Sequence, residues 1–233
     1  MRLRLLIAAT ALFATQPAAA GIIAHYRMGQ GPEQRLVVVE VNDRGDSRAD
    51  MGGGQVLLLL DGTFYVVETD AEGTYAARAE DAFAILEVDM GNRRSAHGPD
   101  PAMPTLPPPP QVQLIRGGTE IVAGHRGTVW RVRDPAAPAG ASAEEFVVSA
   151  DPELAPLNNI LGPRRQTAPD PAFDANGAAA ARWAIYQRGA ILREGRHLRL
   201  ERVEIRPMPE PFALPGPALS REALAARARR TGR

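Results

Sequence analysis

The chain has 233 residues, no cysteine, and equal numbers of basic and acidic residues, 27 of each. Because these charges balance, the surface has no net attraction for nucleic acid, and we expect no nucleic-acid partner. The absence of cysteine excludes disulfides, a thiolate nucleophile and metal sites with cysteine ligands.

Residues 1–20 have the three parts of a cleavable signal peptide. Arg2 and Arg4 make a basic start, an apolar run follows, and residues 18–20 form an A-x-A cleavage site. The apolar run is well short of the ~20 residues that a membrane-spanning helix needs. The sequence therefore predicts export to the periplasm, with a mature chain that starts near Gly21.

Residues 21–217 are predicted to form one β-rich domain. Its first part alternates apolar and polar residues, which is typical of antiparallel strands buried on one face. The Asp-Gly pair at 61–62 predicts a type I′ hairpin turn, because that turn needs positive φ at both central residues. The segment 56–60 is apolar on both faces, so we expect it to be covered on both sides, by helices or by a ligand. The predicted strands of this part are 22–28, 35–41, 47–51, 55–60 and 63–68.

Two segments have helical periodicity. In residues 80–90, Phe83 and Leu86 fall on one apolar face of the predicted helix. The alanine-rich segment 178–188 predicts a second helix. Residues 91–111, in contrast, are rich in proline, which removes backbone donors and favours extended geometry. We expect a long loop or spacer there.

The second half of the domain is again mainly β. A Gly-Gly pair at 117–118 predicts a hairpin turn, and the apolar alternation slips by one residue near Arg202, which predicts a β-bulge. Residues 151–174 have no clear pattern and are predicted to be irregular. The predicted strands are 112–115, 120–122, 127–133, 145–149, 190–193 and 197–205.

Residues 218–233 form a basic tail rich in arginine and alanine. Its apolar side is thin, which argues against firm insertion into a membrane. We favour a solvated terminus and keep peripheral contact with anionic lipid head groups as the alternative.

No residue pattern of an enzyme or a metal site stands out. The four histidines are far apart in the sequence and lack the spacing of metal ligands, although a site assembled only by the fold stays open. The serines lack the sharp-turn context of a hydrolase nucleophile. We therefore assign no catalytic residue, no metal and no cofactor, and rank an uncharacterised hydrolase last among the functions.

Short motifs give the chain a family resemblance. The hairpin sequence at 120–132, Glu-Ile-Val-Ala-Gly followed by Trp-Arg-Val, resembles one in an exported bacterial family of unknown function that is similar to the outer-membrane lipoprotein carrier superfamily. Tyr26, the Leu-Asp-Gly turn at 60–62 and the closing segment 212–216 agree with it. The resemblance implies a curved antiparallel half-barrel with helices on its concave side, where true carriers hold acyl chains. It carries no functional residue over to this chain, and the proline-rich insertion departs from the carrier pattern.

These patterns together predict an α+β domain, a curved antiparallel sheet with about two helices packed on one face. If the helices cover only part of the sheet, an apolar groove remains for a lipid or acylated ligand. We therefore expect a non-enzymatic, carrier-like periplasmic binding protein. The alternative is an envelope scaffold with a filled core, whose proline-rich loop or basic tail binds an envelope protein. The candidate groove residues are Val37, Val39, Leu58, Leu60, Phe64, Phe83, Leu86, Trp183 and Tyr186.

Overall fold

The computed structural model describes residues 20–85, 111–135, 137–138, 143–161, 177–208 and 211–231. The predicted signal peptide lies outside these residues except for Ala20, and the proline-rich stretch lies outside them except for Gln111. Leu86 and the rest of the second half of the predicted helix 80–90 also lie outside them.

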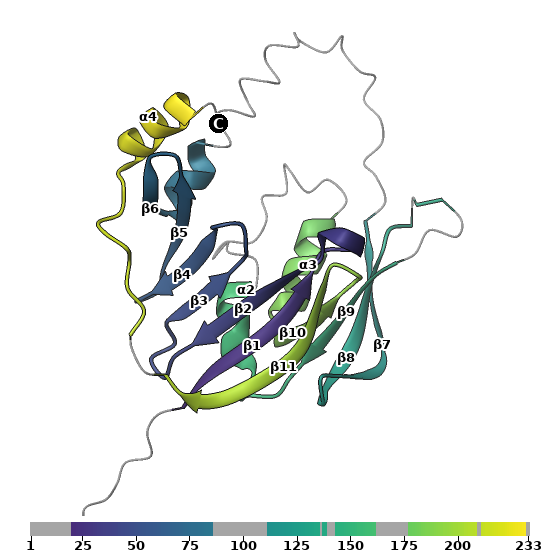
Figure 1. Ribbon diagram of the computed structural model, residues 1–233. Coiled ribbons are helices and arrows are strands. Elements are labelled where there is room, and N and C mark those ends of the chain that lie inside the picture. Colours follow the sequence, from purple (N-terminus) through teal and green to yellow (C-terminus); the bar gives the residue numbers. More distant parts are fainter. Residues whose placement is uncertain are drawn as a thin grey trace, which may run out of the picture.

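Eleven strands of the described residues form one antiparallel sheet (Figure 1). The strand order is β6-β5-β4-β3-β2-β1-β11-β10-β9-β8-β7, so two meanders meet where the first strand pairs with the last. This confirms the predicted antiparallel sheet. The strands are β1 (Ala20–Met28), β2 (Arg35–Val41), β3 (Ser47–Asp50), β4 (Val56–Leu60), β5 (Thr63–Asp70), β6 (Gly73–Arg78), β7 (Gln113–Val122), β8 (His125–Arg133), β9 (Glu144–Ser149), β10 (Ala190–Glu194) and β11 (Leu198–Pro207).

Turn residues fix the connections of the first meander. Asp61 and Gly62 both have positive φ, 47° and 76°, which confirms the predicted hairpin turn between β4 and β5. Asp46 links this turn to the one between β2 and β3. Its carboxylate accepts hydrogen bonds from the side-chain amide of Asn42 at 3.3 Å and from the backbone N–H of Asp61 at 2.9 Å. One buried carboxylate thus holds two turns together.

The second meander differs from its prediction at β7. Residues 113–122 form one strand, and the Gly117-Gly118 pair lies in a β-bulge, so the predicted hairpin turn there is wrong. A Cβ atom on Gly117 would approach Val129 to 3.3 Å, and glycine therefore lets the two strands stay close at the bulge. The bulge predicted near Arg202 is confirmed by a register shift between β1 and β11.

Two short helical turns cover the central core. The 3-10 turn η2 (Ala155–Leu157) and helix α2 (Asn158–Leu161) lie against β2, β3, β4 and β10. Three side chains of this stretch, which starts one residue before η2, are buried in the central core and are spaced three residues apart: Leu154, Leu157 and Ile160. The sequence pattern had placed this stretch in an irregular segment, because two short turns leave too few residues for a periodic signal.

The other helices contact different parts of the sheet. Helix α3 (Ala178–Tyr186) confirms the second predicted helix and packs on β8 and β9, where its Ile185 is buried. Residues 79–85 are helical, as predicted for the start of the first helix. Helix α4 (Arg221–Thr231) lies beside β5 and β6 (Figure 1). The expectation of about two helices on one face is therefore only partly matched. No helix of the described residues is long and apolar enough to cross a membrane.

Strand β4 is buried on both faces, as its apolar sequence requires. Leu57 belongs to the central core, whereas Leu58, on the opposite face, packs with Phe212 and Leu214. These two side chains belong to the segment after β11, and we call residue 208 and residues 211–219 the strap. In Figure 1 the strap runs in yellow-green from the end of β11 along the side of the sheet to α4. The chain's own C-terminal part therefore supplies the second cover of β4.

The turn between β7 and β8 contains a strained alanine. Ala123 has a φ of 51°, in the left-handed region that costs an L-residue roughly 1 kcal/mol. We expect Ala123→Gly to raise the free energy of unfolding by about 0.5–1 kcal/mol in urea denaturation. The control Ala49→Gly, in β3, should lower it. A stability loss in Ala123→Gly would contradict the strained geometry.

The position of η2 makes Leu157 a core residue. We expect Leu157→Ala to lower the free energy of unfolding by about 2–4 kcal/mol, because it leaves a cavity under the sheet. Ile121→Ala removes a side chain that is 66% exposed, so it should change stability by less than about 0.5 kcal/mol. Equal effects of the two substitutions in chemical denaturation would show that η2 does not cover the core.

Candidate functional site

The residues predicted to line one apolar groove are only partly brought together. Val37 and Val39 are completely buried in the central core under η2 and α2, and Phe64 packs against the same cluster. Leu58 and Leu60 lie in a second cluster beside the strap. The two sets cannot line one groove, because Leu57 and Leu58 alternate across the sheet and separate the clusters.

The helical members of the predicted groove lie elsewhere. Tyr186 belongs to a third cluster, between α3 and β9, where its ring meets Phe146 edge-on at 6.1 Å. Trp183 is also on α3, and its indole N–H is buried without a hydrogen-bond partner among the described residues. Phe83 is 38% exposed, and Leu86 lies outside the described residues. The sequence shows that these residues are apolar, but it does not show which of them face one another.

A pocket of about 540 Å³ lies between the sheet and the strap, and we call it the strap pocket. Its floor is apolar and comes from β4 and β5. Of the nine predicted groove residues only Leu58 lines it. The pocket is lined by Glu40, Arg48, Val56, Leu58, Val67, Met208, Pro211, Phe212, Ala213 and Pro215.

Two charged residues border the strap pocket. Glu40 on β2 and Arg48 on β3 are cross-strand neighbours, so their side chains share one face of the sheet. Arg48 is exposed. The pocket therefore offers an apolar floor with one hydrogen-bond donor group and one acceptor group beside it. Sequence reasoning missed these residues because the wall opposite them comes from the strap, at least 160 positions away along the chain.

A second, smaller pocket lies under α4 and has a volume of about 180 Å³. A cavity of about 150 Å³ is enough for a benzene ring, so this pocket has room for one small apolar group. Its walls are mostly apolar, and its polar groups are already engaged with one another. It is lined by Val66, Glu68, Tyr75, Ala77, Ala82, Ile85, Leu224, Arg227, Ala228 and Thr231.

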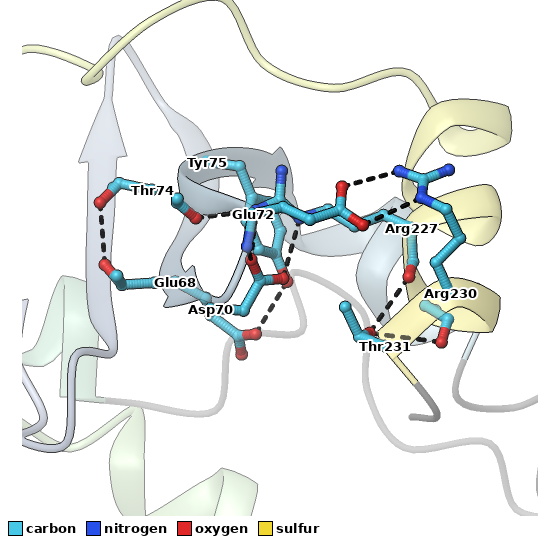
Figure 2. A network of polar contacts seen from close by, with 11 residues as sticks. Glu68, Asp70, Glu72, Thr74, Tyr75, Arg227, Arg230 and Thr231 are labelled. Atoms are coloured by element: carbon cyan, nitrogen blue, oxygen red, sulfur yellow. Dashed lines mark hydrogen bonds and ion pairs between the residues drawn. The ribbon is translucent and has the colours of Figure 1, made fainter.

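Helix α4 is fastened to the β5–β6 hairpin by two arginines (Figure 2). Arg227 donates hydrogen bonds to both carboxylate oxygens of Asp70 and to the backbone carbonyl of Gly73, and its guanidinium lies 4.3 Å from the centre of the Tyr75 ring. Arg230 donates two hydrogen bonds to Glu72, at 2.9 and 2.8 Å. We call these six residues, Asp70, Glu72, Gly73, Tyr75, Arg227 and Arg230, the clasp.

The clasp corrects the expectation of a solvated basic tail. The side chains of Arg227 and Asp70 are only 12% and 7% exposed, and Leu224 is buried beside them. The hydrogen bond from Arg230 is the main reason why the pKa of Glu72 is lower than usual. Arg227 and Arg230, two of the arginines in the basic tail, are thus paired with acidic residues of the same chain. The sequence pattern missed this because the paired residues are 157 positions apart.

A partly buried polar group lies between α3 and β10. The hydroxyl of Tyr186 donates a hydrogen bond to the carboxylate of Glu194 at 2.8 Å, and Glu144 binds Arg182 nearby. Burial raises the pKa of Glu194, and the hydrogen bond from Tyr186 offsets part of that effect. This group connects α3 to the sheet, and we assign it a structural role.

The charged residues of β7 to β11 form a ladder of ion pairs. Arg193 pairs with Glu120 at 2.7 Å and with Glu145 at 3.3 Å, and Arg131 also pairs with Glu145. The hydrogen bond from Arg131 is the main reason why the pKa of Glu145 is lowered. Because these charges neutralise one another, the ladder is a poor candidate for binding a charged ligand.

The histidines of the described residues are not gathered in one site. His25 lies 3.5 Å from Glu204, His125 lies 4.0 Å from Asp151, and His197 is near Gln30. No group of three or more possible metal ligands occurs among the described residues. The histidines of the described residues therefore share no site with one another.

The raised pKa of Glu194 predicts a pH-dependent stability. Because the folded protein disfavours the ionised carboxyl, the wild type should lose stability relative to Glu194→Gln as the pH rises from about 4 towards 7. Tyr186→Phe removes a hydrogen bond that favours the ionised form, so it should enlarge this loss. The measurement is denaturant unfolding at a series of pH values, and a constant difference between wild type and Glu194→Gln would contradict the prediction.

The residues that carry the family resemblance have structural roles. Tyr26 is buried in the central core, Ala123 and Gly124 form the turn between β7 and β8, and the segment 212–216 belongs to the strap. No protein-family model and no curated protein matches the chain, so no residue acquires a role by alignment.

Proposed function

We propose that the protein is a non-enzymatic binding protein of the bacterial periplasm and that it holds an amphipathic ligand in the strap pocket. The observation that carries this proposal is the pocket itself, about 540 Å³ in volume with an apolar floor and charged residues at its rim. Small-molecule sites have volumes of about 300–1,000 Å³ and combine apolar walls with a few polar groups.

The chemistry of the lining favours a ligand with one apolar chain and one polar end. The side chains of Val56, Leu58 and Val67 remove the chain from water, which is worth roughly 0.8 kcal/mol for each buried methylene. Arg48 and Glu40 offer a donor and an acceptor to the polar end. A fatty acid or an acylated peptide has this composition.

The central core is a poorer site for such a ligand. The resemblance to lipoprotein carriers implies a ligand in the concavity of a half-barrel, and we keep this as the proposed relationship of the fold. Val37, Val39 and Leu157, however, are completely buried by other side chains of the protein. We therefore place the ligand beside the strap, where the wall consists of residues outside the central core.

The proposal is tested by native mass spectrometry of the mature protein purified from its own periplasm, followed by extraction and by titration with dodecanoate. We expect a bound amphipathic molecule or saturable uptake of dodecanoate. Ala213→Trp fills the pocket from an exposed position of the strap, so it should weaken dodecanoate binding at least tenfold.

The matched control is Ala180→Trp, an exposed position on α3 that does not line the pocket, and it should bind like the wild type. Circular dichroism of both variants shows whether they fold. Equal binding by the two folded variants would place the ligand elsewhere.

A second candidate function is an envelope scaffold that binds another protein through its surface. The complete burial of the central core favours it, because a filled core needs no ligand for stability. A clean apo mass with no uptake of dodecanoate would move the assignment to this scaffold. The proline-rich segment 91–111 would then be the first to delete in a search for the partner.

A further inference from the structure

We propose that the clasp controls access to the strap pocket: the pairs between α4 and the β5–β6 hairpin hold the strap in place, and their release opens the pocket. The inference deepens the proposed function by naming how that site is regulated. It rests on the proposed function only where dodecanoate entry is measured, because the attachment of the strap to the sheet can be measured by hydrogen exchange without ligand.

The strap has few attachments of its own. It starts where β11 ends, and it contains Pro211, Pro215 and Pro217, which have no backbone N–H to donate to a neighbouring strand. Its middle is held by the packing of Phe212 and Leu214 on the outer face of the sheet, which is the face opposite the central core. A segment of this kind forms a wall only if its far end is fixed.

The far end of the strap is fixed by a short connection to α4. The backbone N–H of Leu219 donates a 2.8 Å hydrogen bond to the backbone carbonyl of Ala76, and Leu219 forms an isolated parallel bridge with Ala77 on the edge strand β6. Helix α4 begins two residues later, and the hydroxyl of Ser220 accepts a hydrogen bond from the backbone N–H of Ala223. Because the connection is this short, movement of α4 is transmitted directly to Leu219.

The clasp is the strongest set of contacts on α4. Charge-assisted, two-pronged hydrogen bonds are the strong class in proteins, and both Arg227 and Arg230 make them. The pair of Arg227 with Asp70 is nearly buried, whereas the pair of Arg230 with Glu72 is more exposed and more open to screening by salt. Besides these pairs, α4 buries only one large apolar side chain among the described residues, Leu224. Loss of Arg227 should therefore release the helix without unfolding the sheet.

The first experiment measures hydrogen exchange in the ligand-free mature protein. We expect Arg227→Gln to speed exchange of the Leu219 amide at least tenfold, while amides of β1 keep their protection. Arg182→Gln breaks a more exposed ion pair, on α3, and should leave exchange of the Leu219 amide unchanged. The double variant Asp70→Arg with Arg227→Asp restores an opposite pair and should recover protection at least in part.

The second experiment measures the rate at which dodecanoate enters the wild type and Arg227→Gln. A faster entry in the variant, at least threefold, supports the inference. Unchanged exchange at Leu219, or faster exchange with unchanged entry of dodecanoate, would overturn it. If exchange accelerates but the wild type takes up no dodecanoate, the strap is fastened as proposed and the assignment of the pocket to a ligand is the part that fails.

Discussion

The pairing of β1 with β11 joins the two halves of the molecule, because every other strand pair in the sheet links neighbours in sequence. Residues about 180 positions apart must therefore meet before the sheet is complete, which is a demanding step in folding. Tyr26 on β1 reinforces this seam, since its buried hydroxyl donates a 3.0 Å hydrogen bond to the carbonyl of Ile191 on β10. Burial raises the pKa of Tyr26, so the hydroxyl keeps its proton and remains a donor.

The pairing of β1 with β11 also determines the path of the chain after its last strand. Because β11 lies in the middle of the sheet, the C-terminal part leaves from the centre and has to cross the outer face to reach β6 at the edge. On its way it covers Leu58, which β4 presents opposite the central core. At the edge, the bridge from Leu219 and helix α4 protect β6, whose unpaired backbone would otherwise invite association with other chains. One segment thus covers a face, protects an edge and forms a pocket wall.

Local signals in the sequence predicted most of the strands, and long-range contacts explain what was missed. The Asp61-Gly62 turn and the bulge near Arg202 follow from the conformational needs of a few adjacent residues, so they were readable. The Gly117-Gly118 pair was misread because glycines suit a turn and a bulge equally well. The predicted groove residues that belong to a hydrophobic cluster lie in three separate clusters. The sequence could not predict this, because period-two alternation shows which residues share a face of a strand but not what covers that face. The strap pocket and the clasp depend on such distant partners and left no local pattern.

The distribution of attachments favours a binding site at the periphery over one in the centre. Opening the central core would expose many fully buried apolar side chains together with the seam, so that opening is comparable to global unfolding. The strap, in contrast, is held mainly by the packing of Phe212 and Leu214, one backbone bridge and the clasp. A carrier has to admit and release its ligand without unfolding, and a scaffold has no such requirement. A pocket wall that is fastened at one end by ion pairs, beside a core that stays filled, meets the requirement of a carrier, because charged pairs can be broken without exposing much apolar surface.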